Sequence, residues 1–192
     1  MNQKISASRS QLQGLLDEFC NQQGDMLTRL AQQVASLFAG GGQLLLAGNA
    51  AFQPVVQLLA GHFTYRLGFD RPALPAIAIG SDPVLAALMV SSGEADQHLV
   101  RHYRSLTGGK QLLLLFSDGG NSPALQILRD EVLENEQLVA LVSATGAADA
   151  LCRDGIETCL ALPTGSRPRQ LELALFAGQL LCELVESELF GV

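Results

Sequence analysis

The strongest constraint on the fold is a set of short, continuous apolar runs separated by helical stretches. Runs that do not alternate with polar residues are typical of strands buried on both faces of a sheet. The runs are Leu44–Ala47, Ala76–Ile79, Leu112–Phe116, Leu138–Val142 and Cys159–Leu162. Between them the spacing predicts helices at about 53–67, 83–106, 123–133 and 147–152. This alternation implies right-handed crossovers and therefore predicts an α/β domain with a parallel sheet and helices on both sides.

Helical periodicity also covers both ends of the chain. Apolar residues from Met26 to Phe38 recur three and four apart, and Gly40–Gly42 would end that helix. An earlier segment around Leu12–Phe19 predicts a separate amphipathic helix, with a bend near Gly24-Asp25. A last helix at 167–190 is apolar nearly all round, which is typical of burial at a subunit interface. We therefore predict N-terminal helices over 1–40 that serve oligomerisation and an α/β domain over 41–192, a single domain overall.

Composition restricts the class of protein. Charged residues make up 16% of the 192 residues, below the ~25% of an ordinary soluble domain. A chain with so little charge is expected to bury surface against copies of itself. The net charge of −7 argues against direct binding of nucleic acid or of an anionic membrane. The first residues contain no apolar segment after their basic residues, so we expect no secretory signal. No apolar run approaches ~20 residues, and we expect a cytoplasmic protein.

The four cysteines show no spacing that suggests a metal site. Cys20, Cys152, Cys159 and Cys182 are scattered and include no C-x-x-C pair. Without a signal for export, such cysteines are expected to be reduced and buried as small apolar side chains.

Two turns that follow predicted strands contain the candidate binding residues, because ligands in parallel sheets lie beyond the carboxyl ends of the strands. The first turn is 48–53, Gly-Asn-Ala-Ala-Phe-Gln, and the second is 117–123, Ser-Asp-Gly-Gly-Asn-Ser-Pro. In the second turn Ser122 or Asn121 would cap a helix that begins at Pro123. Free N–H groups at a helix N-terminus favour an anion. A plain strand–turn–helix junction with its ordinary cap remains the alternative.

Several segments together resemble one known family. They are Gly48-Asn49, the stretch Arg66–Ile79 with its Arg-Pro-x-x-Pro-Ala-Ile-Ala sequence, the loop Ser117–Ser122, and Arg169…Glu172. The chain from about Gly41 to Phe190 resembles the SIS (sugar isomerase) domain, in particular the branch of phosphoheptose isomerase and DiaA, the DnaA initiator-associating protein. The resemblance implies a three-layer, flavodoxin-like fold with a five-stranded parallel sheet. It also implies a homotetramer with sugar-phosphate pockets shared between subunits.

Departures from the family pattern fall within the pocket. The family's first turn has small residues and a serine where this chain has Ala50, Ala51 and Phe52. The second turn here contains Asp118, and two like charges ~4 Å apart cost on the order of 1 kcal/mol in water, so a phosphate would be opposed. The resemblance therefore implies a degenerate phosphosugar pocket whose residues are Asn49, Phe52, Ser117, Asp118, Gly120, Asn121 and Ser122.

The family's catalytic pair is also altered. Aldose–ketose isomerisation needs a base and an acid on either side of the substrate. The resemblance places the family's glutamate and histidine for these roles at His62 and Ala174, and further zinc-site positions at Leu58 and Leu171. It therefore implies no catalytic residue, no metal and no cofactor. His62 fits either a general base or a polar group at a subunit contact.

One further pair of histidines has two interpretations. His98 and His102 are four residues apart, and Glu94 precedes them by one turn. That spacing can hold a metal ion, and it equally fits a solvated helix face.

The C-terminus suggests a protein partner. Leu189 and Phe190 follow a helix at its acidic end, and they either fold back onto the core or bind another protein. The DiaA resemblance implies that such a pair contributes to binding DnaA. We therefore predict a non-catalytic, homotetrameric scaffold that binds DnaA and promotes replication initiation. The alternatives are a phosphoheptose isomerase that converts sedoheptulose 7-phosphate to D-glycero-D-manno-heptose 7-phosphate, or a phosphosugar sensor that binds without reacting.

Overall fold

The structure contains one sheet of five parallel strands. The computed structural model describes residues 1–106, 108–153 and 155–191. The strand order is β2-β1-β3-β4-β5, which is the flavodoxin-like order. The predicted fold class is confirmed. The strands are β1 (Gln43–Gly48), β2 (Ala76–Ala78), β3 (Gln111–Ser117), β4 (Leu138–Ser143) and β5 (Thr158–Ala161).

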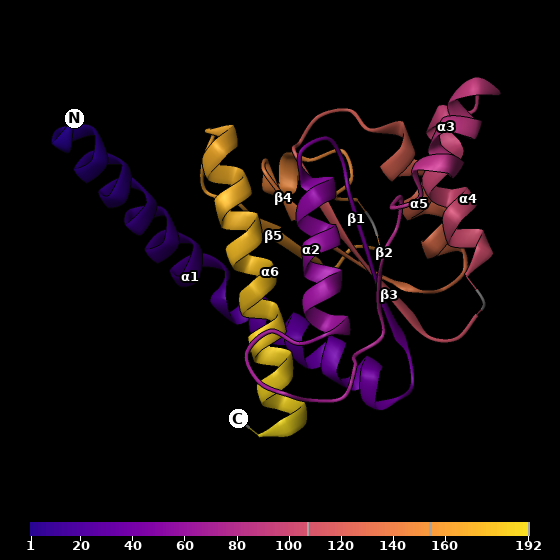
Figure 1. Cartoon of the computed structure of the whole chain (residues 1–192), viewed down its shortest axis with the longest axis horizontal. Helices are drawn as coiled ribbons and strands as arrows, with labels where there is room; N and C mark the ends of the chain where they lie inside the picture. The colour runs from indigo at the N-terminus through magenta and orange to yellow at the C-terminus, as the bar shows by residue number, and fades with distance from the viewer. Residues whose placement is uncertain (107, 154, 192) are drawn as a thin grey trace.

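Helices cover both faces of this sheet (Figure 1). One layer contains α1, α2 and α6, and the other contains α4 and α5, with α3 packed on the outside of α4. The helices are α1 (Asn2–Ala39), α2 (Phe52–Thr64), α3 (Pro83–Ser91), α4 (His98–Ser105), α5 (Pro123–Glu134) and α6 (Arg167–Phe190), with 3-10 turns η1 (Ala95–Gln97) and η2 (Gly146–Ala148).

Two apolar cores lie on opposite sides of the sheet and explain the uninterrupted apolar runs. Successive side chains of a strand point to opposite faces. In β1, Leu44 and Leu46 pack under α1, α2 and α6, whereas Leu45 and Ala47 pack under α4 and α5. All seven residues of β3 are buried. A central strand of this sheet therefore has no face on which a polar residue would meet water.

The N-terminal region differs from the prediction of two helices with a bend. Residues 2–39 form the single helix α1, which continues through Gly24. Nothing lies within 4 Å of the Cβ position at Gly24, and its carbonyl accepts a hydrogen bond from the Thr28 hydroxyl. A glycine within a helix costs only about 1 kcal/mol relative to alanine, so packing further along α1 is enough to keep the helix continuous.

Two other predicted helices are shorter than expected. The segment 83–106 is divided at Gly93, whose φ of +78° lies in the left-handed region, into α3 and, after η1, α4. The segment 147–152 is not a helix, because only the 3-10 turn η2 forms there. The predicted C-terminal helix at 167–190 is confirmed as α6.

The expectation that the cysteines are buried holds only for Cys182. Cys20 is exposed, Cys152 and Cys159 are half-buried, and all four are free thiols. The position of Cys20 on the outer side of α1 accounts for its exposure, because the segment around it is mostly solvent-facing. Burial raises the pKa of the Cys182 thiol to about 12, so this thiol is poorly ionised at neutral pH.

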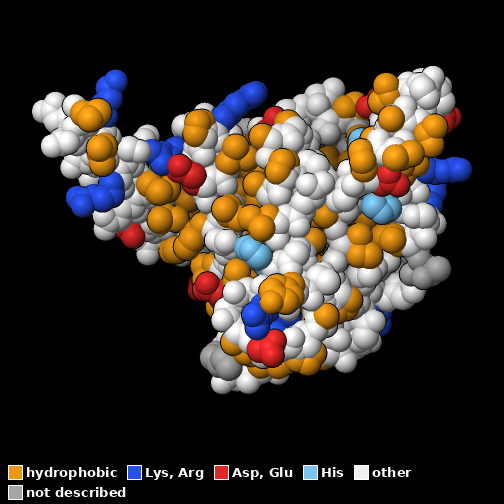
Figure 2. All heavy atoms as spheres, viewed as in Figure 1, with side chains coloured by type: hydrophobic (Ala, Val, Ile, Leu, Met, Phe, Trp, Pro, Cys, Tyr) orange, Lys and Arg blue, Asp and Glu red, His pale blue; other side chains and the backbone are white. Residues whose placement is uncertain are grey.

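The exposed surface of the first layer is rich in apolar groups. Figure 2 shows apolar side chains spread over the face formed by α1, α6 and α2. The first ten residues of α1, 2–11, are all exposed, and among them the Ile5 side chain is 65% accessible. No helix within the described residues is long and apolar enough to cross a membrane.

Candidate functional site

A cleft of about 270 Å³ lies at the carboxyl edge of the sheet. This is the edge where ligands bind in open parallel sheets. Its wall comes from the turn after β1, the start of α2, the turn after β2, the start of α4 and the start of α5. The lining residues are Gly48, Asn49, Ala50, Gln53, Gly80, His98, Leu99, Ser122, Ala124 and Leu125.

The turn after β1 is held in an unusual backbone conformation. A side chain at Gly48 would lie 3.0 Å from the Phe52 backbone, so glycine is required for this close approach. Ala50 has a φ of +45°, a region that costs an alanine roughly 1–2 kcal/mol. Non-glycine residues in that region cluster at functional sites, where the surrounding structure imposes the conformation. The turn thus retains a conformation that suits glycine although the residue is alanine.

The Asp118 side chain is hydrogen-bonded to Asn49 and to its own loop, and it does not line the cleft. Its Oδ1 accepts hydrogen bonds from Asn49 Nδ2 at 2.6 Å and from the Gly120 N–H at 3.0 Å. The Asp118 N–H in turn donates to Asn49 Oδ1 at 3.0 Å. These contacts join the turn after β1 to the turn after β3. The expected repulsion between Asp118 and a ligand phosphate is therefore reduced.

Most of the predicted pocket residues do not line the cleft. Phe52, a predicted pocket residue, is 2% exposed and packs against Phe116 with the ring centroids 6.5 Å apart, so it does not reach into the cleft. Ser117 is fully buried, and its hydroxyl accepts the Gly119 N–H.

Of the three remaining predicted residues of this loop, Ser122 lines the cleft, whereas Gly120 and Asn121 do not. Gly120 is absent from the wall, and Asn121 accepts a hydrogen bond from Gln126. Ser122 is at the N-cap position of α5 without a side-chain cap bond, and Pro123 begins the helix as predicted. Only Asn49 and Ser122 among the seven predicted residues line the cleft.

Sequence reasoning missed the wall formed by the turn after β2 and by α4. Gly80 follows β2 and has a φ of +82°, and a side chain there would lie 2.6 Å from Leu99. A glycine directly after a predicted strand was the available signal for this wall. His98 was expected either to bind a metal or to face solvent, and it lines the cleft instead.

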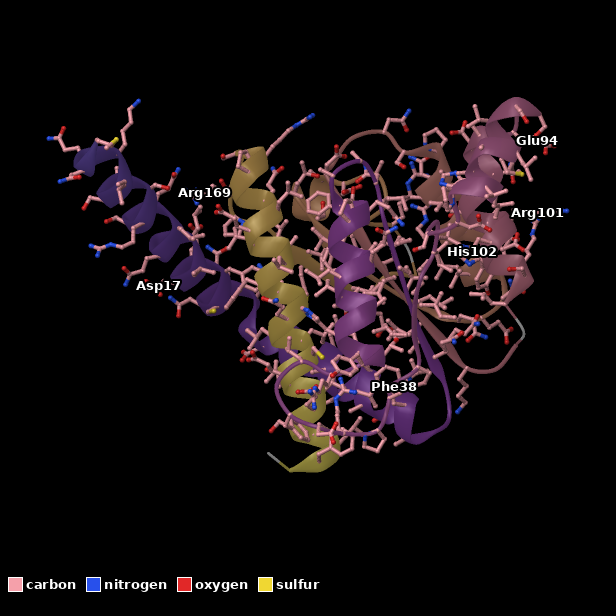
Figure 3. All side chains as sticks on the ribbon, in the orientation of Figure 1. Asp17, Phe38, Glu94, Arg101, His102 and Arg169 are labelled. Atoms are coloured by element: carbon pink, nitrogen blue, oxygen red, sulfur yellow. The ribbon has the colours of Figure 1, made fainter. Side chains whose placement is uncertain are left out.

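The second histidine of that pair has a structural bond. His102 is half-buried, and its Nδ1 accepts the Gly80 N–H at 3.1 Å. Figure 3 shows His102, Arg101 and Glu94 on the α3–α4 side of the molecule, away from Asp17 and Arg169. Among the described residues, no group of three or more His, Cys, Asp or Glu side chains is arranged to hold a metal ion.

His62 lies beyond the part of α2 that lines the cleft, and Ala174 is fully buried on α6. Gly178 of α6 is opposite Leu59 of α2, since a Cβ built there would be 2.2 Å from a Leu59 methyl carbon. Helices α2 and α6 run side by side in the same direction (Figure 1). Ala174 comes four residues before Gly178 on α6, and His62 comes three residues after Leu59 on α2, so the two lie on opposite sides of this contact along the helix axes. His62 is also ten residues into α2, about 15 Å along its axis from the cleft end.

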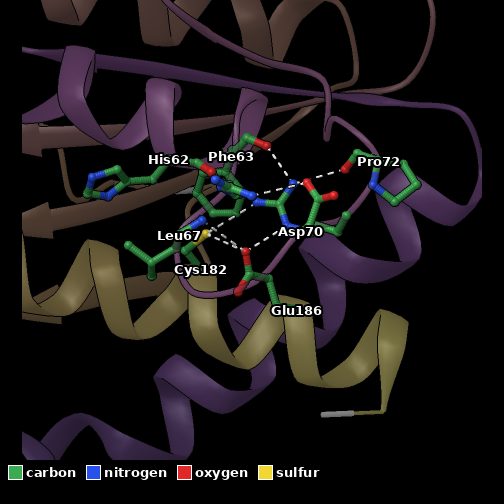
Figure 4. A network of polar contacts seen from close by, with 9 residues as sticks. His62, Phe63, Leu67, Asp70, Pro72, Cys182 and Glu186 are labelled. Atoms are coloured by element: carbon green, nitrogen blue, oxygen red, sulfur yellow. Dashed lines mark hydrogen bonds and ion pairs between the residues drawn. The ribbon is translucent and has the colours of Figure 1, made fainter.

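Arg71 connects this end of α2 to α6 (Figure 4). Its guanidinium donates to the buried Glu186 carboxylate at 2.6 Å and to the backbone carbonyls of His62 and Phe63 at 2.9 Å. Removing one partner of a buried, hydrogen-bonded ion pair typically costs 3–5 kcal/mol. The Arg-Pro sequence at 71–72 therefore has a structural role.

His62 itself has a half-buried ring with an unsatisfied atom. Its Nδ1 is buried and has no hydrogen-bond partner in the described part of the molecule. Burial lowers the pKa of His62, and the nearby Glu186 carboxylate raises it by a smaller amount.

The two C-terminal anchor residues differ in exposure. Leu189 is half-buried and packs on the first core. Phe190 is 37% exposed and makes an edge-to-face contact with Phe69, whose ring centroid is 5.8 Å away. The pair therefore folds partly onto the protein and leaves one aromatic face accessible.

Curated relatives of the chain are phosphoheptose isomerases. The protein from Desulfovibrio desulfuricans is 31% identical over 178 residues, covering 92% of this chain and 83% of its own length. That from Aneurinibacillus thermoaerophilus is 30% identical over 171 residues, covering 85% and 84%. No family model matches the sequence.

Solved structures show the same fold. A phosphoheptose isomerase from Francisella tularensis superposes with a TM-score of 0.83 at 19% identity, covering 96% of this chain and 97% of that one. The enzyme from Neisseria gonorrhoeae gives 0.80 at 18% identity, covering 97% and 98%. The sequence relatives and the strand order agree. The chain therefore belongs to the phosphoheptose isomerase family and has its sugar isomerase (SIS) fold.

Proposed function

We propose that this protein binds a sugar phosphate in the cleft and does not isomerise it. The observation that supports this most strongly is the composition of the wall, in which His98 is the one titratable side chain among the described residues. Isomerisation moves a proton between adjacent carbons and needs two proton-transferring groups. His62 is about 15 Å along α2 from the cleft, and Ala174 has no titratable group.

A sugar phosphate suits the electrostatics of the cleft. The N-terminal ends of α2 and α5, of 13 and 12 residues, both face it. First-turn N–H groups have no partner within a helix and carry partial positive charge. The wall contains no acidic side chain, because Asp118 is turned onto Asn49 and Gly120. The relatives are named for a phosphorylated heptose, which belongs to this ligand class.

Titration calorimetry combined with product analysis tests the proposal. We expect sedoheptulose 7-phosphate to bind the purified full-length protein and to be recovered unchanged after prolonged incubation. Sedoheptulose without the phosphate, as the matched control, is expected to bind more weakly. Absence of binding would contradict the proposed ligand. Formation of the aldose phosphate would show instead that the protein is an isomerase, with the missing group supplied by another subunit.

Self-association belongs to the same proposal. The exposed apolar groups on α1 and on the face of α6 and α2, together with the low charge content, support a homo-oligomer. The homotetramer implied by the family resemblance remains our expectation.

A second candidate function is that of a DnaA-binding scaffold of the DiaA type. The exposed ring of Phe190 beside Phe69 favours it, since aromatic anchors are frequent at protein interfaces. In an oligomer the surface would be repeated and gain avidity. Surface plasmon resonance with immobilised DnaA tests this candidate. We expect Leu189→Ala with Phe190→Ala to weaken binding at least tenfold, and equal binding by the double variant would contradict it. The exposed Tyr65→Ala variant is the control.

A further inference from the structure

Two of the polar side chains in the cleft wall are hydrogen-bonded within the protein through both the oxygen and the nitrogen of their amides. Asn49 uses both its amide oxygen and its amide nitrogen on Asp118. Gln53 donates from Nε2 to the Ile79 carbonyl at 2.8 Å and accepts the Gly48 N–H at 3.3 Å on Oε1. Both amides therefore position the turns of the wall, and each retains one N–H and one oxygen lone pair.

His98 has one ring nitrogen available. Its Nδ1 lies 2.7 Å from the Ala95 carbonyl oxygen. A carbonyl oxygen can only accept, so Nδ1 must carry the proton in this contact. In the neutral ring, Nε2 is then an unprotonated acceptor, and no donor to it is found among the described residues. The ring is half-buried in the wall of the cleft.

His102, one turn along α4, has the opposite arrangement. Its Nδ1 accepts the Gly80 N–H, and a backbone N–H can only donate, so the proton of the neutral ring is on Nε2. Two histidines on one helix are therefore held in opposite tautomers by backbone contacts. His102 is absent from the cleft wall, and it supports Gly80, which is part of that wall.

We propose that His98 Nε2 accepts a hydrogen bond from a hydroxyl group of the sugar portion of the ligand. This inference deepens the proposed function and rests on it. An acceptor atom disfavours a phosphate oxygen at that point and favours an O–H donor. The N-terminus of α5 and Ser122 form another part of the wall and can take the anion. His98 is then a specificity-determining residue that distinguishes a phosphorylated polyol from phosphate alone.

Calorimetric titration of three variants tests the assignment at one pH near 7.5. His98→Asn keeps a donor for the Ala95 carbonyl but removes the Nε2 acceptor. A lost hydrogen bond corresponds to about 3- to 10-fold in affinity, and we expect this loss for sedoheptulose 7-phosphate but not for inorganic phosphate. His98→Gln places an amide oxygen near the Nε2 position and is expected to recover part of the affinity. Arg101→Gln, at an exposed position of the same helix that does not line the cleft, is the control and is expected to bind as the wild type does.

The outcomes separate this inference from the proposed function. If the wild type binds sedoheptulose 7-phosphate and His98→Asn binds it equally well, the role of His98 is wrong while the proposed function stands. An equal loss of affinity for inorganic phosphate would also overturn it, because His98 would then contact the anion. If the wild type binds no sugar phosphate, both proposals fail. Thermal unfolding of each variant establishes that the loss does not come from a damaged fold.

Discussion

At the scale of single residues, His62 occupies the position where the family resemblance implies a catalytic glutamate, and its environment is unfavourable for a charge. Its Nδ1 is buried without a partner in the described structure, and burial lowers its pKa despite the neighbouring Glu186. An unsatisfied buried polar atom typically costs about 1–3 kcal/mol. His62 therefore acts in the folded protein as a neutral group that opposes protonation.

This environment predicts a pH dependence of stability. Because the folded-state pKa lies below the unfolded value of about 6.5, the unfolded chain binds more protons between the two values. We expect the free energy of unfolding to fall as the pH is lowered through about 6.5. In His62→Gln the part of this fall that comes from His62 should disappear. Urea denaturation of both proteins between pH 5 and 8 measures it, and an identical pH slope in the two would contradict the assignment.

At the scale of elements, the contact between α2 and α6 depends on a small residue. A Cβ at Gly178 would lie 2.2 Å and 2.6 Å from the two terminal carbons of Leu59. Leu59 is fully buried, so its side chain has little room to move. The glycine thus sets how closely the two helices approach, and with it the position of the α2 N-terminus in the cleft.

Gly178→Ala is therefore expected to be destabilising despite the better helix propensity of alanine. Overpacking of a core costs about 1–3 kcal/mol. Gly61→Ala, also within a helix but with nothing within 4 Å, is the control and should stabilise by about 0.5–1 kcal/mol. Chemical denaturation compares the two variants. A Gly178→Ala protein as stable as Gly61→Ala would show that the helices are not in tight contact.

The elements also show what could be predicted from the sequence. The strands were predictable because burial on both faces leaves uninterrupted apolar runs, as in β3. The break in 83–106 was missed because it depends on one positive φ at Gly93. In the cleft, Asn49 was found because it directly follows β1, and Ser122 because it lies in the turn after β3, directly before α5. His98 was missed as a cleft residue because α4 reaches the wall by packing, which no local pattern records.

At the scale of the whole molecule, the exposed N-terminal part of the long helix α1 supports self-association of the protein. Its first ten residues are exposed, and two of them are joined to α6 through hydrogen bonds of Arg169 to Ser8 and Gln11. A short exposed helical segment is marginally stable by itself in water. A second copy of the chain that packs along this segment would bury its apolar side chains.

We therefore expect light scattering to give a mass four times the 20.4 kDa of one chain. Ile5→Ser with Leu12→Ser on α1 should reduce that mass. The control is Val84→Ser with Leu88→Ser, which removes exposed apolar groups from α3 and should leave the mass unchanged. A wild-type monomer, or an effect of the α3 variant alone, would contradict the assignment of α1 to the interface.

The central claim is that the cleft holds a sugar phosphate without a pair of groups able to move its proton. Nuclear magnetic resonance of sedoheptulose 7-phosphate incubated with the full-length protein in D₂O tests it most directly, because an isomerase exchanges a C1 proton of the ketose with solvent. The account predicts that the resonances of sedoheptulose 7-phosphate broaden because it binds the protein, and that no deuterium appears at its C1. Deuterium incorporation that depends on the protein would contradict it.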